Sequence, residues 1–192
     1  IMVTGGGPGA MEATHLGAWL AGRPDEALDE ALNILTTAPS YKDNGWLESS
    51  FEVMERLPRV EDYKSIGIPT WLYGHEPATP FATHIAKYFD NSIREDGLLT
   101  IAKGGVIYSP GSAGTMQEIF QDAAQNHYLT CGYASPMVFF GSRYWREKFP
   151  VYSMLKNLHC NGCYKNLLLS LTDDPDEAVN TIMDFVTEGR IY

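Results

Sequence analysis

The chain has 192 residues, of which 44% are hydrophobic and 20% charged, and this composition excludes extended disorder and collagen-like repeats. Its 24 acidic and 14 basic side chains give a net charge of −10, and so negative a surface repels the phosphate backbone of nucleic acids. No apolar run approaches the roughly 18 residues of a membrane span. The three cysteines are too few for a disulfide framework and fit a reducing compartment such as the cytoplasm.

Short apolar runs alternate with helical patterns along the chain, a rhythm that is typical of βαβ units around a parallel sheet. The apolar runs predict strands over residues 1–4, 66–73, 106–108, 137–140 and 167–171. Apolar residues at helical spacing predict helices after Gly9 and from Pro24, and then over residues 51–57, 80–93 (with a second helix to 102), 115–127, 144–158 (with a break at Pro150) and from Pro175 onward, with Asp174 as N-cap.

Together these elements predict a fold of the α/β class, a Rossmann-like doubly wound parallel sheet flanked by helices on both faces. We expect residues 1–192 to form a single nucleotide-binding domain. The first predicted strand begins at Ile1, which is not an initiator methionine. We therefore also expect the chain to lack the first strand and helix of that domain.

Two glycine-rich loops, at residues 5–10 and 110–114, each follow a predicted strand and precede a predicted helix. Such a loop directs free backbone N–H groups and the positive end of a helix dipole at one point, which suits a phosphate group. In a doubly wound sheet these loops lie at the carboxyl ends of the strands, where ligands bind. The expected phosphate-binding residues are Gly6, Gly7, Gly111, Ser112, Ala113, Gly114 and Thr115.

The first loop also fits the dinucleotide fingerprint G-x-G-x-x-A. That fingerprint requires an acidic residue about 20 positions further on, at the end of the next strand, to bind a ribose hydroxyl. Residues 23–26 read Arg-Pro-Asp-Glu instead and predict the start of a helix. The sequence therefore favours a mononucleotide or phosphosugar ligand over NAD.

Thr115 and Glu118 in the second loop allow two interpretations. Their spacing fits a capping box, in which Thr115 is the N-cap and Glu118 reaches back to its N–H. On local sequence alone this structural role is the expected one. In the other interpretation, Glu118 is a functional carboxylate one turn inside a helix that binds phosphate.

The run P-G-x-x-G-T-x-x-E, formed by Pro110, Gly111, Gly114, Thr115 and Glu118, resembles the P-G-G-x-G-T-x-x-E hallmark of the LOG ("lonely guy") family. Members of this family are phosphoribohydrolases, also described as nucleotide 5′-monophosphate nucleosidases, and were once labelled lysine decarboxylases. The chain differs from the hallmark at Ser112, where the family usually has its second glycine. The first loop is similar to the family's G-G-G-x-x-G-L-M, with differences at Ala10 and Glu12.

The resemblance covers roughly the whole chain from Gly5 and implies a hydrolase that releases free base and ribose 5-phosphate from a nucleoside 5′-monophosphate, with no metal or organic cofactor. It implies Glu118 and Arg94 as catalytic residues. Asn91, which lies at helical spacing before Arg94, is a further candidate for contact with the substrate. A carboxylate beside C1 stabilises the positive charge that develops there, and a guanidinium orients it or binds the nucleotide. The resemblance also implies a cytoplasmic homodimer or larger homo-oligomer.

Three alternatives stay open at this point. The fold also serves non-catalytic carriers or sensors of a nucleotide or of molybdenum cofactor, although such a protein needs no carboxylate at C1. From its own neighbours, Arg94 is expected to be a solvated arginine paired with Glu95 or Asp96. Cys160 and Cys163 form one half of a zinc pattern without a second pair, which favours an ordinary turn and no metal.

Several polar residues outside the motifs receive structural expectations. His84, Lys87 and Asn91 recur at helical spacing and predict a polar helix face. The stretch of residues 74–81, which includes His75 and Glu76, is expected to line the base pocket. His127 and Tyr128 are expected to pack at the end of the second loop's helix or to meet a partner subunit.

Overall fold

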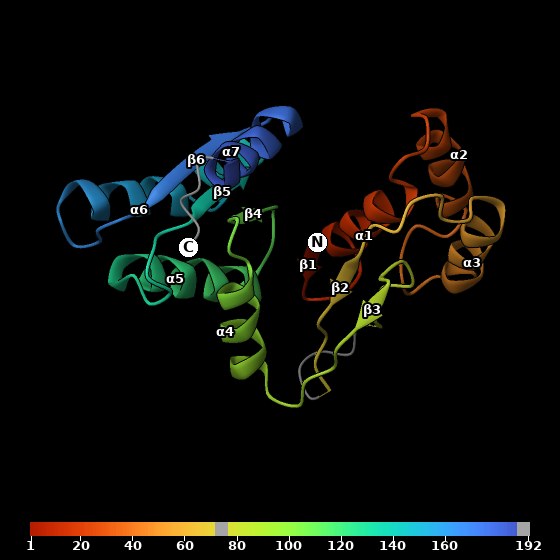
Figure 1. Cartoon of the computed structure of the whole chain (residues 1–192), viewed down its shortest axis with the longest axis horizontal. Coiled ribbons are helices and arrows are strands. Elements are labelled where there is room, and N and C mark those ends of the chain that lie inside the picture. The colour runs from red at the N-terminus through yellow and green to blue at the C-terminus, as the bar shows by residue number, and fades with distance from the viewer. Residues whose placement is uncertain (72–76, 188–192) are drawn as a thin grey trace. The chain divides into compact units, whose positions relative to one another are not determined.

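The computed structural model describes residues 1–71 and 77–187 (Figure 1). They form two compact units, unit 1 from residue 1 to 98 and unit 2 from residue 99 onward. Each unit contains a three-stranded parallel sheet with helices packed against it. The α/β class and the parallel strand pairing predicted from the sequence are therefore confirmed.

Unit 1 places strand β2 (Ser65–Gly67) between strands β1 (Met2–Thr4) and β3 (His84–Ile85). Its helices are α1 (Ala10–Leu20), α2 (Glu26–Leu35), α3 (Trp46–Arg56) and α4 (Asn91–Ile101), whose last three residues belong to unit 2. Apolar residues three or four positions apart put one face of each of the first three helices into a common core with Phe81. That core contains Leu16, Leu20, Ala27, Ala31, Ile34, Val53 and Leu57.

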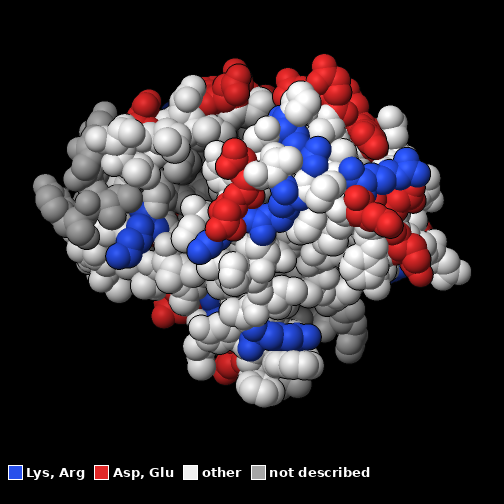
Figure 2. Space-filling model, turned by 45° about the vertical axis from the view of Figure 1, so that its right-hand side comes forward, with Lys and Arg blue, Asp and Glu red and all other residues white. Residues whose placement is uncertain are grey.

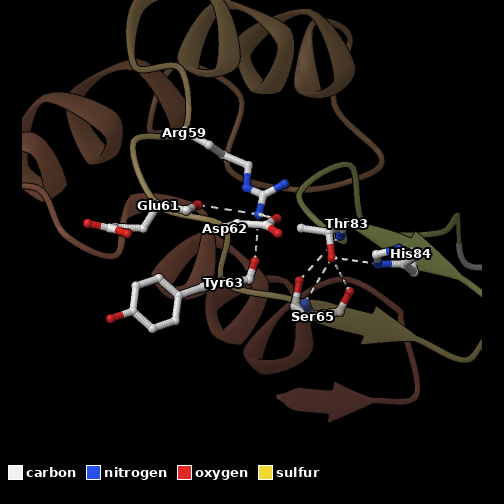
Figure 3. A network of polar contacts seen from close by, with 7 residues as sticks. All are labelled: Arg59, Glu61, Asp62, Tyr63, Ser65, Thr83 and His84. Carbon is white, nitrogen blue, oxygen red and sulfur yellow. Dashed lines mark hydrogen bonds and ion pairs between the residues drawn. The ribbon is translucent and has the colours of Figure 1, made fainter.

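Side-chain hydrogen bonds fix the segments on both sides of β2 (Figure 3). Before the strand, Nη2 of Arg59 donates to the carbonyl oxygen of Tyr63 at 2.7 Å and to Oδ1 of Asp62 at 3.2 Å. Beside the strand, the Thr83 hydroxyl donates to the Ser65 carbonyl at 2.7 Å and accepts the Ser65 N–H at 2.9 Å. Thr83 thereby holds β3 alongside β2.

The prediction of a helix over residues 80–93 is wrong. The structure has β3 here and an isolated parallel bridge between Thr70 and Tyr88, and α4 begins only at Asn91. The N–H groups of residues 86 and 88 donate to the carbonyls of residues 67 and 69, both at 3.0 Å. Pairing with distant backbone outweighs the weak local helix propensity, and so His84 and Lys87 are exposed but share no helix face with Asn91.

The predicted strand over residues 66–73 is shorter in the structure. Its regular part, β2, ends at Gly67, and Pro69 interrupts the pairing before the bridge at Thr70. Residues 72 and 73 lie outside the described residues.

Unit 2 places strand β5 (Pro136–Phe140) between β4 (Val106–Tyr108) and β6 (Leu168–Thr172). Its helices are α5 (Ala113–Tyr128), the π-helical turn η1 (Tyr144–Lys148), α6 (Val151–Cys160) and α7 (Pro175–Thr187). Met137 and Phe139 share a core with α5, η1 and α6. Val138 is also buried and points to the opposite sheet face. Helix α7 packs against β5 and β6.

The predicted start of α7 is confirmed in detail. Oδ1 of Asp174 accepts the N–H of Asp176 at 2.9 Å, as expected of an N-cap followed by proline. The Thr172 hydroxyl, at the end of β6, donates to the Glu177 carboxylate. The break at Pro150 is also present, between η1 and α6.

On the face shown in Figure 2, lysine and arginine side chains alternate with aspartate and glutamate. Ion pairs such as Arg56–Glu52, at 2.6 Å, connect such groups at the surface. Among the helices that the structure describes, none is long and apolar enough to cross a membrane.

Candidate functional site

The first glycine loop connects β1 to α1 in unit 1 and has a fixed backbone. Gly6 has φ of +74° and Gly9 has φ of +78°, conformations that favour glycine. A Cβ at Gly6 would lie 2.9 Å from the backbone nitrogen of Ile68, so the loop also needs glycine for close packing. The N–H of Gly6 donates to the Thr4 hydroxyl at 2.9 Å, and Gly6 and Gly7 are both buried.

A buried histidine lies beneath this loop. Nε2 of His15, on α1, is 2.8 Å from the Thr4 hydroxyl that accepts the Gly6 N–H. Burial lowers the pKa of His15, because the charged imidazolium loses its hydration. His15 is not among the site residues predicted from the sequence. Its only signal was a histidine on the apolar face of α1.

The predicted arginine lies against the first glycine loop. A Cβ at Gly5 would come within 2.7 Å of Nη1 of Arg94, so the guanidinium packs directly on the Gly5 backbone. Nη2 of Arg94 donates to Oδ1 of Asn91 at 2.7 Å and lies 3.5 Å from Oε1 of Glu95. The pairing with Glu95 is confirmed, but the expected solvation of Arg94 is wrong, since only 11% of its side chain is exposed. The first glycine loop of unit 1 covers the Arg94 guanidinium at Gly5.

Asn91 and Glu95 complete this network on the first turn of α4. Nδ2 of Asn91 donates to Oε1 of Glu95 at 2.7 Å, so one amide links the guanidinium to the carboxylate. Glu95 is 1% exposed. The sequence predicts Glu95 only as a surface partner for Arg94, because a glutamate near a helix start is usually solvated.

The second glycine loop connects β4 to α5 in unit 2. Ser112 is the N-cap residue of α5, and its carbonyl accepts the N–H of Met116 at 3.0 Å. The prediction of a capping box between Thr115 and Glu118 is therefore wrong, because Thr115 lies within the first helical turn. The physical reason is Gly111: a Cβ there would lie 2.0 Å from Oγ1 of Thr115. The missing side chain lets Thr115 fold over the loop while the helix begins at Ala113.

Glu118 lies one turn inside α5 and is half-buried. Because Ser112 is the N-cap residue, Glu118 forms no capping box with Thr115. The other residues predicted to bind phosphate, from Gly111 to Thr115, form the tip of the loop and the first turn of α5, and Ser112 and Ala113 are exposed there. The Tyr144 hydroxyl donates to the Gly111 carbonyl and ties the loop to η1.

A second carboxylate lies on the same face of α5, one turn beyond Glu118. Asp122 is 4% exposed, and its Oδ2 accepts the hydroxyl of Tyr108 at 2.6 Å. Burial raises the pKa of Asp122 to about 6 and outweighs the Tyr108 hydrogen bond, which lowers it. Burial and the charges of Asp122 and Glu118 raise the pKa of Tyr108. The i, i+4 spacing from Glu118 was the one sequence signal for Asp122.

The cysteines and the histidines named from the sequence form no further site within the described residues. Cys131, Cys160 and Cys163 are exposed free thiols, and within the described part of the chain no group of three or more His, Cys, Asp or Glu side chains lies close enough to hold a metal ion. Nδ1 of His127 accepts the N–H of Lys165 at 2.9 Å, and Tyr128 is 77% exposed. The expected base-pocket residues Gly74, His75 and Glu76 lie outside the described residues.

In comparisons with known proteins, no family model matches the chain, and no curated protein matches it at a significant level of similarity. The resemblance to the LOG family therefore rests on the residues of the two glycine loops, Arg94 and Glu118, alone.

Proposed function

We propose that the protein is a hydrolase of the LOG family that cleaves the N-glycosidic bond of a nucleoside 5′-monophosphate, releasing free base and ribose 5-phosphate. The observation that carries this proposal is the second glycine loop. This loop comes after the parallel strand β4 and leads directly into helix α5. The half-buried Glu118 lies one turn inside that helix.

The loop and the helix start supply the chemistry for the phosphate. Backbone N–H groups of the first turn of α5 have no partner within the helix, and the helix dipole adds partial positive charge at the same end. The Ser112 side chain is exposed and makes no capping hydrogen bond within the described structure, which leaves its hydroxyl able to donate to a phosphate oxygen. Serine is thus compatible with phosphate binding at the position where the family usually has glycine.

Glu118 supplies the negative charge that the reaction needs. Breaking an N-glycosidic bond produces an oxocarbenium-like sugar, and a preorganised carboxylate stabilises its positive charge in the transition state. In our proposal Glu118 has this role, and Arg94 orients the substrate through its planar guanidinium. Asn91 contributes through the hydrogen bonds that hold Arg94.

We infer a finer architecture and setting as well. The pairing orders β3-β2-β1 and β4-β5-β6 are those of the two mononucleotide-binding halves of a doubly wound Rossmann-like sheet, and this supports that topology for the chain. The net charge of −10 and the few cysteines support a cytoplasmic protein that binds no nucleic acid. A homodimer or larger homo-oligomer follows from the family resemblance.

The direct test is incubation with a panel of purine and pyrimidine nucleoside 5′-monophosphates, with the free base measured by chromatography. We expect base release from at least one monophosphate, unaffected by chelators, and no release from the matching nucleosides. Tight binding of monophosphates without base release would contradict the hydrolase and favour a carrier or sensor.

A further inference from the structure

A series of buried hydrogen bonds connects helix α1 to the first glycine loop of unit 1. His15 is 0% exposed, and its Nε2 lies 2.8 Å from the hydroxyl of Thr4, the last residue of β1. That hydroxyl accepts the N–H of Gly6 at 2.9 Å, and the Gly6 carbonyl accepts the N–H of Thr79 at 2.8 Å. Both polar groups of Gly6 are therefore bonded within unit 1, which fixes the backbone where the loop begins.

The donors and acceptors of this series assign the protonation state of His15. The Thr4 hydroxyl already accepts the Gly6 N–H, and it has one proton of its own to donate. If Nε2 of His15 accepts that proton, only Nδ1 of the ring has no partner among the described residues. If Nε2 donated instead, the hydroxyl proton would have no acceptor there either. Fewer unpaired buried groups favour a neutral His15 with its proton on Nδ1.

Protonation of His15 would break this arrangement. An imidazolium only donates, so Nε2 could no longer accept the Thr4 hydroxyl, and a charge would be buried. Burial accordingly lowers the pKa of His15, and no charged side chain among the described residues contributes to that shift. Strand β2 leaves little room for the ring to move, since a Cβ at Gly67 would lie 3.6 Å from Nε2.

Two charged groups contact the loop itself. The Arg94 guanidinium packs on the Gly5 backbone. Burial raises the pKa of the Glu12 carboxylate, which is hydrogen-bonded to the Gly9 backbone. A pH dependence of the loop therefore belongs to His15 only if a change at His15 alone removes it.

We propose that neutral His15 is the positioning residue of the first glycine loop: through Thr4 it holds Gly6 so that the loop backbone binds phosphate, and its protonation releases the loop and weakens binding. The ligand, a phosphate group, is taken from the proposed function, on which this inference rests. His15, Thr4 and the loop all belong to unit 1. Phosphate binding should therefore weaken at acid pH by more than the ionisation of the phosphate itself explains.

The variant His15→Gln tests this role, because glutamine Oε1 accepts the Thr4 hydroxyl in place of Nε2 but does not titrate. Calorimetry with inorganic phosphate and with AMP measures the affinities at pH 7.5 and pH 5. We expect similar affinities in the two proteins at pH 7.5, and several-fold tighter binding by the variant at pH 5, where fewer wild-type molecules have a neutral His15. The ionisation of the ligand and of Glu12 is common to both proteins. His84→Gln, which removes an exposed histidine of unit 1, is the matched control and should bind like the wild type at both pH values.

The amide signal of Gly6 in NMR spectra provides a readout that needs no ligand. Its chemical shift should change between pH 7.5 and pH 5 in the wild type, together with the titration of the His15 ring, and should stay constant in His15→Gln. Thr4→Val provides a second variant in case His15→Gln does not fold, because it removes the hydroxyl and keeps the branched shape. It should bind phosphate more weakly than the wild type at pH 7.5 and equally at pH 5.

The possible results separate the role of His15 from the proposed function. Equal affinities of wild type and His15→Gln at pH 5, a Gly6 signal that changes only when the whole protein unfolds, or a wild type that binds neither ligand at pH 7.5 overturns the proposal. So does wild-type affinity of Thr4→Val at pH 7.5. If phosphate affinity follows His15 but no base is released from any monophosphate, the proposed function fails and the role of His15 stands.

Discussion

Glu118 is the residue on which the proposed reaction depends most. Changing Glu118 to Gln keeps its volume and its place in the first turns of α5 but removes the negative charge. We expect kcat for base release to fall roughly a hundredfold or more, as for other preorganised electrostatic groups. Monophosphate binding should persist, because the loop from Gly111 to Thr115 binds the phosphate in our proposal.

The stability of the same variant separates chemistry from structure. Since Thr115 is not the N-cap of α5, Glu118 makes no capping box, and Glu118→Gln should change the free energy of unfolding by less than about 1 kcal/mol. Glu147→Gln is a suitable control, because Glu147 is an exposed carboxylate of unit 2 paired with Arg143 at 3.2 Å. Base release near the wild-type rate in Glu118→Gln contradicts the mechanism even if the ligand class is correct.

Asp122 gives the protein a predictable dependence of stability on pH. Its pKa is about 6 in the folded protein and about 3.9 in an unfolded chain. The folded state therefore binds the proton more tightly, so the stability that Asp122 contributes is present below about pH 4 and is lost as the pH rises through 6. The difference corresponds to about 3 kcal/mol.

The variant Asp122→Asn should remove this dependence. Its amide oxygen still accepts the Tyr108 hydroxyl, but no charge is buried at pH 8. Urea unfolding at pH 8 should show a variant more stable than wild type, by up to about 3 kcal/mol, and the difference should disappear near pH 4. An identical pH profile in the two proteins would show that Asp122 does not titrate in this range.

At the scale of elements, the start of α5 depends on the absence of a side chain at Gly111 but not at Gly114. A Cβ at Gly111 would overlap the Thr115 side chain, whereas a Cβ at Gly114 meets nothing within 4 Å. Gly111→Ala should therefore lower the free energy of unfolding by about 1–3 kcal/mol, as overpacking usually does. Gly114→Ala, within the helix, should raise it by roughly 0.5–1 kcal/mol. Thermal unfolding of both variants measures the contrast, and equal effects would mean that the loop is not packed as described.

The elements also show which parts of the fold the sequence can predict. The start of α7 was predicted correctly, because the N-cap Asp174 and the proline after it act within one turn of the backbone. The helix over residues 80–93 was wrong because Thr83 bonds to Ser65, a contact across 18 positions that no local pattern reveals. Thr115 was misplaced for a similar reason, since its position depends on the space left at Gly111.

The candidate site also has parts that the sequence predicts and parts that it does not. Glycine loops are visible in sequence because glycine adopts positive φ far more readily than other residues, as at Gly6 and Gly9. Glu95 and Asp122 were not predicted as buried, because in sequence they resemble the polar residues of any helix surface. Their burial follows from tertiary packing around α4 and α5, and packing cannot be obtained from periodicity alone.

At the scale of the whole molecule, ligand binding should appear as thermal stabilisation. A ligand that binds only the folded state at one hundred times its Kd stabilises it by about 2.7 kcal/mol, which for a chain of 192 residues raises the Tm by roughly 5–10 °C. We expect AMP or another 5′-monophosphate to give such a shift and the matching nucleoside to give a much smaller one, because the glycine loops in both units are suited to a phosphate group. Inorganic phosphate at the same concentration is the control for simple anion binding. Strong stabilisation by NAD with none by monophosphates would contradict this proposal and favour the dinucleotide fingerprint at residues 5–10, whose G-x-G-x-x-A pattern this chain also satisfies.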